Sequence, residues 1–252
     1  QLFYLPLYGG DYLIYLKTYQ LDYKASGFSM NPNNLGCFLI LTIFMTIFYL
    51  RVKITKNYFL YYVLLVLQIL CLILTKSRGA LLAFLIGCFL LLILFVKDNK
   101  KIALFFLGII ACLSVILFTN YPDLISTIFD PNHRTNMQRI QIWLISIQII
   151  KDFPFGVGIL NYENIYPYYW ETGQKYLPHA HNWYLHTFIE SGLVSGSIFF
   201  LFYFSIFTYF FKHLKNSNLI IPITLVSFSI FNLSDYILTD TRICILLVLI
   251  IF

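Results

Sequence analysis

Two histidines, His179 and His181, stand at the start of a long apolar run, and they are the residues of this chain best suited to proton transfer. Imidazole titrates near neutral pH, so it can take or give a proton under physiological conditions. Where a helix begins, water and substrate can reach His181, which suits a general base or proton shuttle. Ionisable groups beside a membrane span are costly to keep. We therefore expect a reactive site at a membrane surface.

The same histidines raise the question of a metal ion. A His-x-His pair with His186 nearby can bind zinc, but no Asp, Glu or Cys stands at ligand spacing in the sequence. His181 and His186 are five residues apart and do not share a helical face well. We therefore expect no metal, with zinc as the less favoured alternative. Glu190 is costly if it faces lipid, so we expect it to face the bundle interior. There it would either orient a histidine or an arginine, or only satisfy an interhelical hydrogen bond.

Three arginines can together bind an anion. Ser77 suits an N-cap position and places Arg78 in the first turn of the next helix, where the helix dipole disfavours a cation unless an anion is nearby. Backbone N–H groups and a guanidinium at a helix start can bind phosphate or pyrophosphate. Arg134 and Arg139 follow in a long polar segment, and Arg139 shares a helical face with Trp143 if that segment is helical. The alternative for each arginine is an interaction with lipid headgroups.

The composition is that of a membrane protein. Hydrophobic residues make up 60% of the chain and charged residues 11%, and the mean hydropathy is +0.78, which excludes an ordinary soluble fold of this length. A helix of roughly 20 apolar residues crosses a hydrocarbon core of about 30 Å. We therefore expect the all-α class, a polytopic helical membrane protein that forms one integral membrane domain over residues 1–252. The expected spans are residues 35–50, 58–74, 80–96, 102–119, 183–211, 219–231 and 238 to the end.

Charge indicates which ends of the spans face the cytoplasm. Lys and Arg cluster in the turns after the first, third and fifth expected spans, and the positive-inside rule assigns these turns to the cytoplasm. The largest piece on the other side, residues 120–182, is longer than a helix connection needs, and long loops are usually functional. It contains an expected surface helix over residues 135–150 and a Pro/Gly turn over residues 153–158. We expect the active surface in this extracytoplasmic loop.

Other classes of function are not favoured. The net charge of +6 comes mostly from the basic turns that set topology, so we do not expect nucleic-acid binding. The five cysteines lie in or beside apolar runs without paired spacing and are expected to be buried hydrophobic residues. No glycine-rich phosphate loop is present, so ATP hydrolysis is not indicated. Because the sequence begins with Gln1 and stops inside an apolar run, we expect it to be a fragment of a longer protein.

Five short motifs in order resemble the O-antigen ligase and polymerase superfamily of bacterial membrane glycosyltransferases. These motifs are Asn31-Pro32-Asn33, Ser77-Arg78-Gly79, Arg139-x3-Trp143, Pro154-x-Gly156-Val157-Gly158 and His181-Asn182-x9-Gly192. One departure is Ser195, where the ligase pattern usually has Gly. The resemblance implies a fold related to the GT-C glycosyltransferases, of which this chain would be the C-terminal part. It also implies a location in the bacterial cytoplasmic (inner) membrane and no cofactor.

The resemblance also implies a reaction. The donor would be a glycan on undecaprenyl pyrophosphate, and the acceptor would be a further glycan repeat in a polymerase or a lipid A core sugar in a ligase. His181 would take the acceptor proton, and Arg78 and Arg139 would stabilise the leaving pyrophosphate. The expected further substrate contacts are Arg134, His179, Asn182, Glu190 and the sugar-stacking ring of Trp170.

The sequence is therefore compatible with three functions. Polymerisation of surface-polysaccharide repeat units (O-antigen, capsule or exopolysaccharide) is favoured narrowly over ligation because of Ser195. A transporter or flippase of lipid-linked sugars is less favoured, because it should place ionisable groups near the bilayer midplane. In this sequence the informative charges gather at one face instead.

Overall fold

The computed structural model describes residues 24–29, 31–52, 58–96, 130, 132–170, 179–213 and 219–251, with isolated positions between 100 and 119. Within these residues the chain is helical and contains no strand, which confirms the predicted all-α class. The main helices are α2 (Pro32–Val52), α3 (Tyr58–Leu74), α4 (Arg78–Phe95), α7 (Arg134–Asp152), α8 (Tyr162–Ile165), α9 (Trp183–His213), α10 (Ile220–Phe231) and α11 (Thr241–Ile251).

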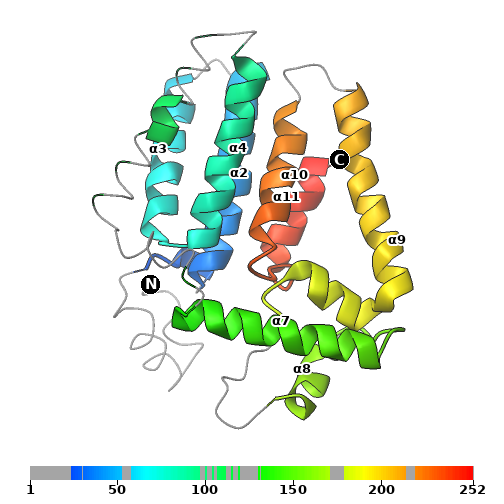
Figure 1. Ribbon diagram of the computed structural model, residues 1–252. Helices are drawn as coiled ribbons and strands as arrows, with labels where there is room; N and C mark the ends of the chain where they lie inside the picture. Colours follow the sequence, from blue (N-terminus) through cyan, green and yellow to red (C-terminus); the bar gives the residue numbers. More distant parts are fainter. Residues whose placement is uncertain are drawn as a thin grey trace.

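The apolar helices run side by side as a bundle (Figure 1). By length and composition, α2, α4 and α9 can each cross a membrane, while α3, α10 and α11 are apolar but shorter. Most predicted spans match these helices within a few residues: 35–50 is α2, 58–74 is α3, 80–96 is α4, 219–231 is α10, and 238 onward is α11. The predicted span 102–119 lies largely outside the described residues.

Small residues let the central helices approach closely. A Cβ atom on Gly36 of α2 would lie 2.7 Å from the Cβ of Ala80 in α4, and a Cβ on Gly87 of α4 would overlap Phe44 and Ser227. In a membrane no hydrophobic driving force brings helices together, so their association depends on close approach of their backbones. The α2, α4 and α10 helices therefore form a tight core that fixes the positions of their ends.

Helix α9 is broken at Gly192, inside the span predicted over residues 183–211, a break that the sequence did not predict. Gly192 has φ 80° and ψ 170°, outside the helical region. The first part of α9 lies across the end of the bundle beside α7, and the second part turns along the bundle (Figure 1). A straight helix of 31 residues would be about 45 Å long, which exceeds a hydrocarbon core of about 30 Å.

The Pro/Gly turn predicted at residues 153–158 forms backbone hydrogen bonds with α9 on both sides of this break. The N–H groups of Val157 and Gly158 donate to the carbonyls of Ile189 and Glu190 at 2.9 and 3.0 Å, and Leu193 N–H donates to the Pro154 carbonyl at 2.8 Å. Backbone groups freed by a helix break need such partners in a membrane protein. The turn therefore replaces the hydrogen bonds that α9 loses at Gly192.

The predicted surface helix over residues 135–150 is confirmed as α7, which crosses one end of the bundle (Figure 1). We call this end the α7 end. Ile142 and Ile149 of α7 pack with Tyr162, Ala180 and Ile189 in a second apolar cluster, separate from the core of the bundle. The α7 helix and the first part of α9 thus form one layer. This layer positions Arg139 and the histidines of the predicted site, whereas Arg78 stands at the start of α4.

Candidate active site

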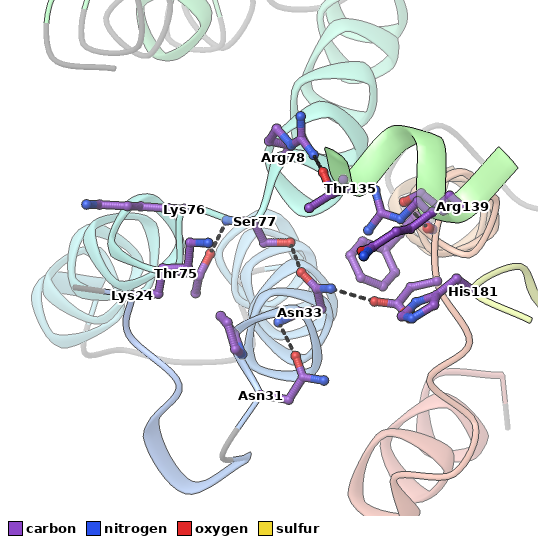
Figure 2. A pocket seen from close by; sticks show the side chains of 16 residues that line it. Lys24, Asn31, Asn33, Thr75, Lys76, Ser77, Arg78, Thr135, Arg139 and His181 are labelled. Carbon is purple, nitrogen blue, oxygen red and sulfur yellow. Dashed lines mark hydrogen bonds and ion pairs between the residues drawn. The ribbon is translucent and has the colours of Figure 1, made fainter. Parts of the chain in front are cut away.

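A cavity of about 380 Å³ opens at the α7 end of the bundle. Its walls come from the start of α2, the turn between α3 and α4, the first half of α7, and the loop between α10 and α11 (Figure 2). Its volume is in the range of small-molecule sites, roughly 300 to 1,000 Å³. Three residues predicted to be catalytic, Arg78, Arg139 and His181, all line this cavity.

His181 is paired with Asp235 in the cavity wall. Nδ1 of His181 lies 3.1 Å from Oδ1 of Asp235, and the side chain of His181 is 19% exposed whereas that of Asp235 is 4% exposed. Burial acts to raise the pKa of the Asp235 carboxyl, but its hydrogen bond with His181 and the nearby imidazoles bring the pKa below the usual value. The carboxylate is therefore ionised at neutral pH and accepts a hydrogen bond from Nδ1 of His181, which carries the ring proton. That leaves Nε2 of His181 as the basic nitrogen.

The backbone at His181 is unusual. Its φ is 45°, in the left-handed region that non-glycine residues rarely adopt. Such conformations cost about 1 to 3 kcal/mol and persist where the surroundings fix them. Here the Nε1 group of Trp143 in α7 donates to the His181 carbonyl at 3.3 Å. The helical face predicted to carry Arg139 and Trp143 therefore helps to hold the histidine.

His179 lies directly against His181. The two ring centroids are 4.1 Å apart, and Nδ1 of His179 accepts a long hydrogen bond of 3.4 Å from the His181 backbone N–H. Burial, together with the neighbouring His181, lowers the pKa of His179 to about 4. His179 is therefore neutral at physiological pH and supports the ring of His181 rather than lining the cavity.

A chain of hydrogen bonds links the start of α4 to the histidine. Ser77 Oγ donates to Asn33 Oδ1 at 2.7 Å, and Asn33 Nδ2 donates to Asp235 Oδ2 at 2.6 Å (Figure 2). Ser77 is the N-cap residue of α4 as predicted, but its hydroxyl makes no capping hydrogen bond. The hydroxyl is engaged by Asn33 instead. The carboxylate that orients His181 is thereby fixed by residues from α2 and α4.

Arg78 and Arg139 stand on another wall of the cavity, on different helices. Nη2 of Arg78 donates to Thr135 Oγ1 at 2.5 Å and to Asn136 Oδ1 at 3.3 Å, so Arg78 connects the start of α4 to the start of α7. Arg139 is one helical turn beyond Thr135 on α7 and lines the cavity with it. Two guanidinium groups therefore border a single polar space.

The cavity favours an anion. Among its lining side chains four are cationic, namely Lys24, Lys76, Arg78 and Arg139, and Asp235 is acidic. The backbone at the start of α4 also borders the cavity, and a helix N-terminus attracts negative charge. A phosphate or pyrophosphate group is the ligand that this arrangement suits best.

The other predicted substrate contacts do not line this cavity. Asn182 accepts from Leu185 N–H at 3.0 Å and donates to the Leu233 carbonyl at 3.0 Å, so it holds the start of α9. Glu190 lies 3.3 Å from Nε2 of His186, which agrees with the expectation that it pairs with a polar group. Trp170 packs in the apolar cluster of α7, and Arg134 is exposed at the first position of α7. Substrate binding by these residues stays a prediction.

Sequence reasoning missed Asp235 and Asn33 as site residues. It also found no acid at ligand spacing from the histidines, whereas the fold brings Asp235 to His181 from 54 positions further along the chain. Asp235 stands in a short connection between two apolar helices, on the same side as the histidines. An acid confined to such a connection was the signal available, since a charge there is costly unless it has a partner.

Comparison with known proteins adds one match. A model of the family described as O-antigen ligase matches residues 63–201, which is more than half of the chain. The matched segment includes Arg78, Arg139 and His181, whereas Asn33 and Asp235 lie outside it. No curated protein and no solved structure was found to match.

Proposed function

Because the chain belongs to the O-antigen ligase family, we propose that it transfers a glycan from undecaprenyl pyrophosphate to a hydroxyl group of an acceptor. The reaction would take place at the extracytoplasmic face of the bacterial cytoplasmic membrane. The observation that carries the proposal is that one cavity holds both a His181–Asp235 pair and two arginines from different helices. A base beside an anion site is what glycosyl transfer from a pyrophosphate carrier requires.

The base in this proposal is Nε2 of His181. Asp235 accepts the hydrogen bond from Nδ1, fixes the tautomer and stabilises the imidazolium that forms. Nε2 takes the proton of the acceptor hydroxyl as the acceptor oxygen forms a bond to the anomeric carbon. The bond between that carbon and the pyrophosphate oxygen breaks in the same step. Asp235 touches no substrate in this scheme and is a positioning residue.

The arginines stabilise the charge that develops on the leaving group. Undecaprenyl pyrophosphate departs with the electron pair of the broken bond, and guanidinium groups offer bidentate hydrogen bonds to phosphate oxygens. Arg78 and Arg139 would each bind one part of the pyrophosphate. Because base and leaving group act on opposite sides of the anomeric carbon, the reaction should invert its configuration.

We further propose that the acceptor is a glycan repeat unit, so that the protein is a polymerase of surface polysaccharide. Ser195 supports this choice, since it departs from the usual ligase pattern. The second candidate is an O-antigen ligase with the lipid A core as acceptor, and the description of the matching family favours it. Both candidates use the same donor and the same cavity. In both, membrane lipid surrounds the helix bundle.

A transporter of lipid-linked sugars is not supported. Its binding site should lie near the middle of the bundle. In the described part of the chain the cationic cavity lies at the α7 end instead, where the α2 and α4 helices begin.

The test is complementation of two bacterial strains, one lacking its polysaccharide polymerase and one lacking its O-antigen ligase. The full-length gene is introduced as wild type, as His181→Ala and as His213→Ala. His213 is the matched control, because it is the last residue of α9, at the far end of this helix from the cavity. Glycan chain length and attachment are read on a gel, and protein levels are compared by blot.

Long chains restored by wild type and by His213→Ala, but not by His181→Ala, would support polymerisation with His181 as base. Glycan transferred to the core only in the ligase-deficient strain would support ligation instead. Full activity of His181→Ala at normal protein level would contradict the proposed role of the histidine.

A further inference from the structure

Three possible metal ligands meet beside the cavity. Each of these residues, His179, His181 and Asp235, offers one ligand atom, and the three atoms lie within 4.8 Å of one another. The sequence alone argued against a metal because it offered no acid at ligand spacing from the histidines. The fold supplies that acid as Asp235, so the three side chains together offer a set of metal ligands.

We propose that His179, His181 and Asp235 form an inhibitory binding site for a zinc-like divalent cation. Two imidazoles and one carboxylate form a ligand set typical of zinc, and this ion usually takes a fourth ligand from solvent. Imidazole ligands favour zinc and similar transition metals over magnesium or calcium, which prefer oxygen. His181 and Asp235 line the cavity, so a water molecule or a phosphate oxygen there can complete the coordination.

The contacts of Asp235 prepare it to be a ligand. Its Oδ1 accepts hydrogen bonds from His181 Nδ1 at 3.1 Å and from the backbone N–H of Tyr236 at 2.9 Å, while Oδ2 accepts from Asn33. Hydrogen bonds of this kind orient a carboxylate toward a metal. A cation between Nδ1 and Oδ1 would replace the proton that these atoms share without moving either chain segment far.

His179 can reach the same ion at a small cost. Its contact with the His181 backbone N–H is 3.4 Å, at the long end for a hydrogen bond, so a metal bond would replace a weak interaction. The four cationic side chains of the cavity oppose a divalent ion, so we expect weaker binding than at structural zinc sites.

Metal binding would stop the proposed transfer. A cation on Nδ1 of His181 leaves the proton on Nε2, and a protonated Nε2 cannot accept the proton of the acceptor hydroxyl. This inhibitory effect rests on the proposed function. The binding itself does not, because it depends only on the three side chains.

The binding experiment uses the full-length protein in lipid nanodiscs at pH 7.5, titrated with Zn²⁺ in a chelator-buffered series, and with Co²⁺ to read ligand-field absorption. We expect one ion per chain for wild type and for the control His213→Ala. His179→Ala and Asp235→Asn should each weaken binding at least 10-fold. No stoichiometric binding, or binding unaffected by both variants, would overturn the proposal.

Folding of the variants is checked by thermal unfolding without metal. If His179→Ala fails to fold, His179→Gln takes its place, because its amide oxygen can still accept the hydrogen bond from His181 N–H. The same 10-fold loss is expected, and binding equal to wild type would overturn the proposal.

Inhibition is measured separately. Saturating Zn²⁺ should abolish transfer by wild type, a chelator should restore it, and His179→Gln should need at least 10-fold more Zn²⁺ relative to its own uninhibited rate. Transfer that persists in the Zn²⁺-saturated wild type would overturn the inhibitory role. If metal-free wild type transfers nothing, the proposed function fails while the titration still decides the metal site.

Discussion

Nδ1 of His181 and Oδ1 of Asp235 lie 3.1 Å apart, although 54 residues separate them in the chain. The imidazole precedes α9 and the carboxylate follows α10, and the backbone N–H of Trp183 donates to the Asn232 carbonyl at 3.0 Å between the same two segments. The pair therefore depends on how α9 and α10 pack. Trp183 is buried among Phe200, Tyr203 and Phe228 and anchors that packing.

Asp235→Asn should lower kcat for glycan transfer by about 100-fold to 10,000-fold, in the range that general-base catalysis contributes. An amide can donate to Nδ1 of His181, which would place the ring proton on Nε2 and remove the base. KM for the lipid-linked donor should stay near the wild-type value, because Asp235 does not touch the pyrophosphate in our scheme. Steady-state kinetics in chelator-treated buffer measure both. A rise in KM with kcat unchanged would indicate a role in binding instead.

Arg139→Lys should lower kcat/KM about 10-fold to 100-fold, because Lys keeps the charge but loses the bidentate hydrogen bonds to phosphate. Inorganic pyrophosphate should also become a weaker inhibitor of this variant. The matched control is Lys151→Ala, which removes an exposed cation from the far end of the same helix. A loss in Lys151→Ala with none in Arg139→Lys would mean that Arg139 acts only through the general charge of α7.

Gly192→Ala should destabilise the protein by about 2 to 4 kcal/mol, because the backbone is in a region that L side chains rarely adopt and the new Cβ would overlap the backbone of Phe155. Gly108→Ala is the control, since a Cβ there meets no atom within 4 Å. Fluorescence-detected thermal unfolding in detergent measures both variants. A melting temperature of Gly192→Ala equal to that of Gly108→Ala would contradict the assigned break in α9.

Asp240→Asn should reduce stability at neutral pH and have a smaller effect in acid. The hydrogen bond from Arg242, whose Nη2 lies 2.8 Å from Oδ2, lowers the pKa of Asp240 despite its burial, and Asn34 also donates to it. A carboxyl group whose pKa is lower in the folded state stabilises the fold above its unfolded pKa of about 3.9, and that stabilisation is lost as pH falls through the folded value. The difference in melting temperature between wild type and variant should therefore be larger at pH 7 than at pH 3. An equal difference at both would show that charge is not the cause.

Local patterns were enough to predict most of the helices. Runs of apolar residues bounded by charges gave α2, α3 and α4, and the surface helix expected over residues 135–150 is α7. The motifs also identified the three residues that now line the cavity, Arg78, Arg139 and His181.

Features that depend on distant contacts were not predicted. The break at Gly192 lies inside a predicted span, and the hydrogen bonds that accompany it come from residues 153–158 in another part of the chain. Asp235 was not predicted as a site residue, because nothing in its own neighbourhood in the sequence indicates His181. The hydrogen bond from Asn182 to the Leu233 carbonyl, which holds the start of α9, was likewise not predicted, and substrate binding by Asn182 stays a prediction.

The chain of hydrogen bonds from Ser77 through Asn33 to Asp235 crosses the limits of the segment that carries the family signature, residues 63–201. A chimaera that received only this segment from another family member would combine the arginines and the histidine of one parent with the asparagine and the carboxylate of the other. Its activity would then report on compatibility between the parents at Asn33 and Asp235. Exchange of acceptor specificity between relatives should accordingly succeed more often when the start of α2 and the loop between α10 and α11 are transferred together with the segment.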